Sequence, residues 1–149
     1  MVRASRTLPN TYLRILRMES HSSSRPELSL VVPTYNEREN ITLLVERIHK
    51  SLSDYNYELI VVDDNSPDGT SELARSLASK YPLKVIVRKN ERGLASAVVA
   101  GFNQARGKIL GVMDADLQHP PEFIPTLIKA VRDGADIAIA SRYIKGGGI

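Results

Sequence analysis

Short apolar runs alternate with stretches of helical periodicity along most of this chain, and this alternation limits the fold more than any other feature. The apolar runs cover residues 28–33, 57–62, 83–87, 109–113 and 136–140. Between them, apolar residues recur every three or four positions, which is typical of amphipathic helices. Strands that are apolar throughout are typical of sheets covered by helices on both faces. The sequence therefore predicts an α/β fold with a Rossmann-like, doubly wound, mostly parallel sheet.

Proline and glycine mark the expected helix boundaries. Pro121 can begin a helix, because the first helical turn tolerates a residue without an N–H group. Gly107 and Gly134 follow the helices expected over 94–102 and 121–131, where glycine commonly ends a helix. The first of these two helices is marked by the apolar residues Leu94, Val98, Val99 and Phe102.

Polar clusters follow the predicted strands at their carboxyl ends. They cover residues 33–37, 63–70, 114–118 and 141–143. The returns from helix to strand carry no comparable cluster. Because ligands of open parallel sheets bind beyond the carboxyl ends of the strands, these clusters predict one binding site at that edge.

Asp114 and Asp116 follow the fourth apolar run, one residue apart. In an extended chain such residues point the same way, so both carboxylates could face one point, where a cation would relieve their repulsion. Gln118 adds an amide oxygen. These oxygens suit Mg²⁺ or Mn²⁺, which leave further positions to water and phosphate. We predict a metal bound by Asp116 and Gln118; the alternative is a solvated acidic turn that caps the next helix.

The usual glycine-rich phosphate loops are absent from the sequence. No G-x-G-x-x-G follows the first strand, and no G-x₄-G-K-[ST] occurs. Phosphate must therefore be held by other groups, for which the metal and the guanidinium of Arg142 are the candidates. A metal on a diphosphate neutralises charge on a departing nucleoside diphosphate, so group transfer is favoured over hydride transfer.

Basic residues concentrate before the first strand. Residues 1–26 contain five arginines and one glutamate, a net charge of +4, which leaves −1 of the chain's formal +3 for the rest. A nearly neutral folded part does not indicate a nucleic-acid partner. We divide the chain into a disordered basic tail, 1–26, and a domain, 27–149; a membrane-surface segment over 12–18 is the alternative for the tail. The chain has no cysteine and no apolar run long enough to span a membrane.

Five motifs, in this order along the chain, resemble those of family 2 glycosyltransferases. They are VPTYNE (32–37), VVDDNSPDGT (61–70), RGL (92–94), MDADLQHPP (113–121) and SRY (141–143). The resemblance covers about residues 28–148 and is strongest to the polyprenyl-phosphate mannosyltransferase branch of that family. It implies a GT-A fold and metal-dependent, inverting transfer of mannose from GDP-mannose to dolichyl (polyprenyl) phosphate, with Mg²⁺ or Mn²⁺ as cofactor.

The resemblance also assigns roles to single residues. The nucleoside pocket should be lined by Pro33, Tyr35, Glu37, Val62 and Asp64. The diphosphate and its metal should be held by Asp114, Ala115, Asp116 and Gln118. Arg142 should contact the phosphate or sugar of the donor, and Asp116 and Arg142 are the expected catalytic residues.

Several neighbouring residues have structural explanations that we weigh against these roles. Asp63 is expected to anchor its turn rather than contact a ligand. His119, which precedes two prolines, is expected to be a turn residue rather than a catalytic base. Arg92 is expected either to bond a carboxylate of the site or to be solvated.

The resemblance predicts a nucleotide-sugar-binding half followed by an acceptor-binding part, whereas the sequence ends in GGGI (146–149). We therefore expect a C-terminally incomplete GT-A unit, peripheral at the cytoplasmic face of a membrane. Two alternatives stay open: the same chemistry with another donor such as UDP-glucose, and a donor-binding fragment without turnover. A nucleotidyltransferase is a weaker third, because the basic, glycine-rich triphosphate loop is missing.

Overall fold

The computed structural model describes residues 24–141 and contains a four-stranded parallel sheet of order β3-β2-β1-β4. Its strands are β1 (Leu28–Thr34), β2 (Tyr57–Asp63), β3 (Leu83–Val87) and β4 (Ile109–Val112). Its helices are α2 (Arg38–Ser51), α3 (Thr70–Leu77), α4 (Leu94–Gln104) and α5 (Ile124–Arg132), with the 3-10 turn η1 (Pro121–Phe123) leading into α5. This architecture confirms the predicted parallel α/β fold.

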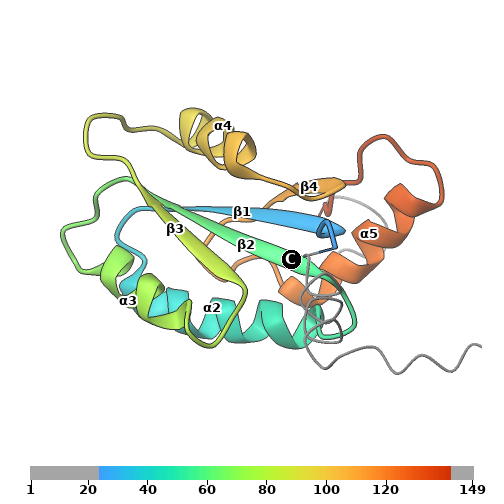
Figure 1. The fold of residues 1–149 in the computed structure, drawn as a ribbon, viewed down its shortest axis with the longest axis horizontal. Helices are drawn as coiled ribbons and strands as arrows, with labels where there is room; N and C mark the ends of the chain where they lie inside the picture. The colour runs from blue at the N-terminus through green and yellow to red at the C-terminus, as the bar shows by residue number, and fades with distance from the viewer. Residues whose placement is uncertain (1–23, 142–149) are drawn as a thin grey trace, which may run out of the picture.

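Helices cover both faces of the sheet (Figure 1). One face packs against α2, α3 and α5, and the larger apolar core lies there. The side chains of Ile41, Leu44 and Ile48 on α2 are fully buried in it, as the periodicity predicted. The other face packs against α4 through a smaller cluster that includes Val31 and Ile60.

The helix α4 lies on the sheet through small residues rather than through its large apolar ones. Ala97 and Gly101 are its buried residues, whereas Leu94 and Val99 are 62% and 57% exposed. A Cβ atom at Gly101 would lie 2.5 Å from a Cγ atom of Val31, so glycine is required for this close approach. The predicted helix is present, but two of the apolar residues that marked it, Leu94 and Val99, do not face the core.

Gly107 also serves close packing rather than helix termination. α4 ends at Gln104, and a Cβ atom at Gly107 would lie 2.4 Å from the backbone nitrogen of Ser29. The expectation that Gly107 ends the helix is wrong, because the turn before β4 passes directly against β1. Gly134, with φ of 112°, does end its helix as predicted, and its N–H donates to the carbonyl of Val131 at 3.1 Å.

The predicted fifth strand is not formed. Residues 136–140 have no strand assignment, and Ile137 and Ile139 are 77% and 78% exposed. An apolar run becomes a strand only when a neighbouring strand pairs with its backbone, and among residues 24–141 the backbone of this run does not pair with the outer side of β4.

Three residues of the predicted tail contact the domain. Asn56 Nδ2 donates to the carbonyl of Ser24 at 3.0 Å, and Arg25 Nε donates to the carbonyl of Arg106 at 2.8 Å. The carbonyl of Pro26 accepts from the N–H of Lys108 at 3.0 Å. Residues 1–23 lie outside the described part, so the domain boundary at residue 26 stays a prediction. None of the helices within 24–141 has the length and apolarity needed to cross a bilayer.

A buried carboxylate joins the carboxyl ends of β1 and β2. Asp63 is 0% exposed, and its Oδ1 accepts hydrogen bonds from Thr34 Oγ1 at 2.7 Å and Ser66 Oγ at 2.6 Å. Its Oδ2 accepts from the N–H of Ser66 at 2.9 Å. The expectation that Asp63 anchors the turn is confirmed. Through these bonds the end of β1 and the turn after β2 form one unit.

We predict that Asp63→Ala lowers the free energy of unfolding by roughly 3 kcal/mol, because it leaves three buried donors without an acceptor. The measurement is urea denaturation followed by circular dichroism. Asp54→Ala, which removes an exposed carboxylate from the turn before β2, is the matched control and should change stability by less than about 0.5 kcal/mol. Equal stability of the two variants would contradict the anchoring role.

Candidate functional site

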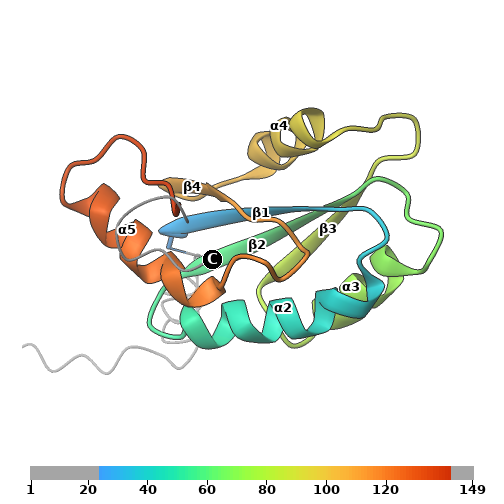
Figure 2. The same ribbon diagram turned by 180° about the vertical axis from the view of Figure 1, so that it is seen from behind.

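The order of the strands brings three polar loops together at one edge of the sheet. β1 lies between β2 and β4, so the segments that follow these three strands are neighbours. The chain runs outward from β1 through β2 to β3 and then returns to place β4 on the other side of β1 (Figure 2). This reversal of strand order is where parallel sheets usually bind ligands.

The loop after β1 is held by the turn after β2. The N–H of Asn36 donates to Ser66 Oγ at 2.9 Å, and the N–H of Glu37 donates to Thr70 Oγ1 at 3.0 Å. The Glu37 carboxylate accepts from Asn40 Nδ2 at 2.9 Å, which also supports the first turn of α2. Tyr35, which directly precedes Asn36, is 43% exposed, so part of its ring is accessible at this end of the sheet.

Arg92 lies over this aromatic ring. Its guanidinium carbon is 4.0 Å from the centre of the Tyr35 ring, within the range of a cation–π interaction. Neither expectation for Arg92, a hydrogen bond to a site carboxylate or simple solvation, describes this contact. It joins the loop before α4 to the loop after β1.

Asp64 is bound by an arginine that the sequence motifs did not indicate. Arg88 Nε donates to Asp64 Oδ1 at 2.7 Å, and Arg88 Nη2 donates to Asp64 Oδ2 at 2.9 Å. The side chains of Arg88 and Asp64 are 6% and 8% exposed. A signal for this pair was present, because Arg88 directly follows the third apolar run and so lies at the same edge of the sheet.

The environment keeps Asp64 ionised. Burial would raise the pKa of Asp64, but hydrogen bonds from Arg88 and the Gly93 amide, together with the charges of Arg88 and Arg92, lower this pKa below its usual value. At neutral pH the group is therefore a carboxylate that can only accept hydrogen bonds.

The two aspartates after β4 point outward around a buried alanine. Asp114 and Asp116 are exposed, whereas Ala115 is 3% exposed and packs in the larger core. The N–H of Gln118 donates to Asp116 Oδ1 at 3.0 Å, and Leu117 between them has φ of 62°. The predicted alternation of inward and outward side chains is thus present at this loop.

These residues fit a metal ion that is shared with a ligand. Within 24–141, no three His, Cys, Asp or Glu side chains gather closely enough to hold a metal by themselves. Mg²⁺ and similar ions usually take one or two carboxylates and complete their shell with water and substrate phosphates. Asp114, Asp116 and the amide of Gln118 offer oxygens of this kind on an exposed loop.

The remaining residues considered for the site are buried, partly buried or outside the described part of the chain. Val62 is fully buried beneath α4, so its side chain belongs to the core, as does that of Ala115. Pro33 is partly buried in the last part of β1. His119, which was expected to be a turn residue and not a site residue, is partly buried in the turn before η1. Arg142 lies outside the described residues, and its role stays a prediction.

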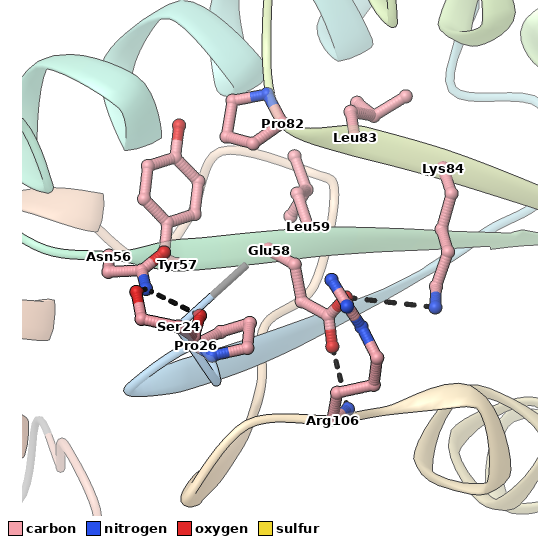
Figure 3. A pocket seen from close by; sticks show the side chains of 10 residues that line it. All are labelled: Ser24, Pro26, Asn56, Tyr57, Glu58, Leu59, Pro82, Leu83, Lys84 and Arg106. Atoms are coloured by element: carbon pink, nitrogen blue, oxygen red, sulfur yellow. Dashed lines mark hydrogen bonds and ion pairs between the residues drawn. The ribbon is translucent and has the colours of Figure 1, made fainter. Parts of the chain in front are cut away.

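The opposite edge of the sheet carries a separate pocket of about 310 Å³ (Figure 3). Its central acidic group, Glu58, accepts from Ser29 Oγ at 2.6 Å and from the N–H of Arg106 at 2.7 Å, with Lys84 Nζ 3.7 Å away. Burial would raise the pKa of Glu58, but these hydrogen bonds and the neighbouring cations lower it. The paired carboxylate joins β1, β2 and the turn before β4, which is a structural role.

Comparison with known proteins gives a consistent result. The family described as "Glycosyl transferase family 2" matches residues 29–149. A dolichol-phosphate mannosyltransferase from Pyrococcus furiosus is 60% identical over 121 residues, which are 81% of this chain and 34% of that protein. The dolichol-phosphate mannosyltransferase of Saccharomyces cerevisiae is 47% identical over 127 residues, which are 83% of this chain and 47% of that protein.

A similar solved structure is a mannosyltransferase from Pyrobaculum calidifontis in complex with GDP-Man and Mn²⁺. It superimposes with a TM-score of 0.62 at 32% identity, covering 85% of this chain and 39% of that one. The chain spans about a third to a half of the length of the curated relatives that it matches. Since the family match extends from β1 to Ile149, the chain belongs to glycosyltransferase family 2.

Proposed function

We propose that this chain binds GDP-mannose together with Mg²⁺ or Mn²⁺, and that the protein to which it belongs transfers the mannose to dolichyl or another polyprenyl phosphate. The observation that carries the proposal is the arrangement at the carboxyl ends of the strands, here called the carboxyl edge. There the end of β1 is flanked by an anchored hydrogen-bond acceptor, Asp64, and by two exposed carboxylates, Asp114 and Asp116. The curated relatives named dolichol-phosphate mannosyltransferase support the choice of sugar and acceptor.

The nucleoside is proposed to lie over the loops after β1 and β2. The partly exposed ring of Tyr35, with Arg92 over it, offers an aromatic surface for the base, and Asp64 offers a carboxylate acceptor for an N–H of the base. Pro33 and Glu37 are proposed to complete this pocket, while Val62, whose side chain is fully buried, supports it from within the core. Because the two loops are bonded to each other, both recognition groups are held in place before the ligand binds.

The diphosphate is proposed to lie beside the loop after β4. Asp116 and Gln118 would hold the metal, which would supply charge neutralisation for the departing nucleoside diphosphate, and Asp114 would lie beside the diphosphate. Asp116 is the proposed catalytic residue within 24–141, and Arg142 is its proposed partner at the donor phosphate or sugar. Inversion at the anomeric carbon is proposed, with direct attack by the acceptor.

The acceptor needs positioning more than activation. A phosphate monoester has a second pKa of about 6, so it is already a nucleophilic anion at neutral pH. The protein therefore has to orient this anion and balance its charge, and a strong general base is not required. Because the acceptor is a lipid, we also propose that the protein works peripherally at the cytoplasmic face of a membrane.

A uridine nucleotide is the second candidate for the donor. A carboxylate such as Asp64 can accept an N–H from uracil as well as from guanine. A Staphylococcus aureus TarS structure in complex with UDP-GlcNAc is also similar, with a TM-score of 0.54 at 31% identity over 60% of this chain and 26% of that one.

We predict that the chain binds GDP-mannose more tightly than UDP-glucose or GTP, and that Mn²⁺ strengthens the binding of the nucleotide sugar. Calorimetric titration of the 149-residue chain with these three ligands, with and without Mn²⁺, measures both effects. Tighter binding of UDP-glucose would favour the second candidate. Failure of both nucleotide sugars to bind would refute the proposed function.

We predict that Asp116→Asn abolishes the effect of the metal. In the wild type, Mn²⁺ should tighten GDP-mannose binding by roughly tenfold or more, because neutralising a diphosphate contributes more than the about 1.4 kcal/mol that this factor requires. In the variant, the affinities with and without Mn²⁺ should agree within about twofold. Asp133→Asn, at the far end of α5, removes an exposed carboxylate and should behave as the wild type. An equal response of both variants would contradict the metal assignment.

A further inference from the structure

Arg88 uses all of its hydrogen-bond donors within the protein. A guanidinium has five N–H donors, and each of them has an acceptor here. Nε and Nη2 donate to the two oxygens of Asp64, and Nη2 also donates to the carbonyl of Gly93 at 3.0 Å. Nη1 donates to Glu91 Oε2 at 3.1 Å and Ser96 Oγ at 2.9 Å. Arg88 is therefore not a group that contacts a ligand.

Asp64, in contrast, keeps one acceptor position. A carboxylate has about four lone-pair positions, two on each oxygen. Oδ2 accepts from Arg88 Nη2 and from the N–H of Gly93 at 3.0 Å, so both of its positions are filled. Among residues 24–141, Oδ1 accepts only from Arg88 Nε. The side chain is 8% exposed, so a small opening to the surface remains.

The geometry of the pair fixes the direction of this remaining position. Two parallel bonds between a guanidinium and a carboxylate hold both groups in one plane, and a rotation of the carboxylate would break both bonds. Arg88 is itself held, because its backbone N–H donates to the carbonyl of Asp63 at 2.8 Å. The open lone pair on Oδ1 is therefore pre-oriented rather than selected by the ligand.

Resting on the proposed function, we propose that Arg88 is a positioning residue for nucleobase recognition, which leaves Asp64 with a single oriented acceptor for one ring N–H of the donor base. Guanine and uracil carry a ring N–H on their Watson–Crick edge. Adenine and cytosine carry a ring nitrogen acceptor at the corresponding place, which a carboxylate repels. Arg88 thus selects a class of base without touching it.

The test compares bases of equal ring size on the 149-residue chain. Displacement of a ribose-labelled GDP in the presence of Mn²⁺ gives the affinities for GDP and ADP, and for UDP and CDP. The wild type should prefer GDP to ADP by about tenfold or more, as expected for a hydrogen bond to a charged group. A smaller preference for UDP over CDP should point in the same direction.

Arg88→Lys keeps the charge but cannot make two parallel bonds to a carboxylate. The preference for GDP over ADP should fall to within about threefold, while the affinity for ADP stays within about twofold of the wild type. Arg88→Gln should lose the preference as well. Lys89→Gln removes a positive charge from the next, exposed residue and should keep the wild-type preference.

A purely structural role would give a different pattern. In that case both Arg88 variants would bind GDP and ADP more weakly by the same factor. The ratio of the two affinities would then be unchanged, which would overturn the inference. If Arg88→Gln does not fold by circular dichroism, the ratio in Arg88→Lys decides between the two roles. A wild type that binds GDP and ADP equally would also overturn the inference, whereas a wild type that binds no nucleotide would overturn the proposed function itself.

Discussion

The buried carboxylate of Asp63 determines how the rest of the carboxyl edge is arranged. It has no exposed surface, and it accepts from Thr34 at the end of β1 and from Ser66 in the turn after β2. Ser66 in turn accepts from the backbone of Asn36, so the loop after β1 is connected to the same network. A buried charge is tolerated only when hydrogen bonds replace its lost hydration, which couples the strand ends to the integrity of this turn.

Features that depend on local periodicity were predictable from the sequence. The buried stripe of α2 follows from spacing, and the beginning of the η1–α5 segment at Pro121 follows from the tolerance of a first helical turn for proline; both are present. The outward direction of Asp114 and Asp116 also follows from spacing, because alternation is a property of any extended chain. The anchoring role of Asp63 was correctly inferred from its place at the start of a turn.

Features that depend on partners distant in the sequence were not predictable in the same way. Residues 136–140 have the composition of a strand, but composition does not provide a neighbour to pair with. The inner face of α4 depends on the close approach of Gly101 to Val31, which leaves the larger apolar residues Leu94 and Val99 exposed. The Arg88–Asp64 pair depends on the register that places Val87 beside Asp63, which the sequence alone does not specify.

Ala115 limits how the acidic loop can change during evolution. The alanine points into the core while the aspartates on both sides of it face outward. Insertion or deletion of one residue before Asp114 would exchange these directions, so that carboxylates would enter the apolar core. Variation in loop length is therefore expected beyond Gln118, while the spacing from β4 to Asp116 stays constant among sequences that keep this site.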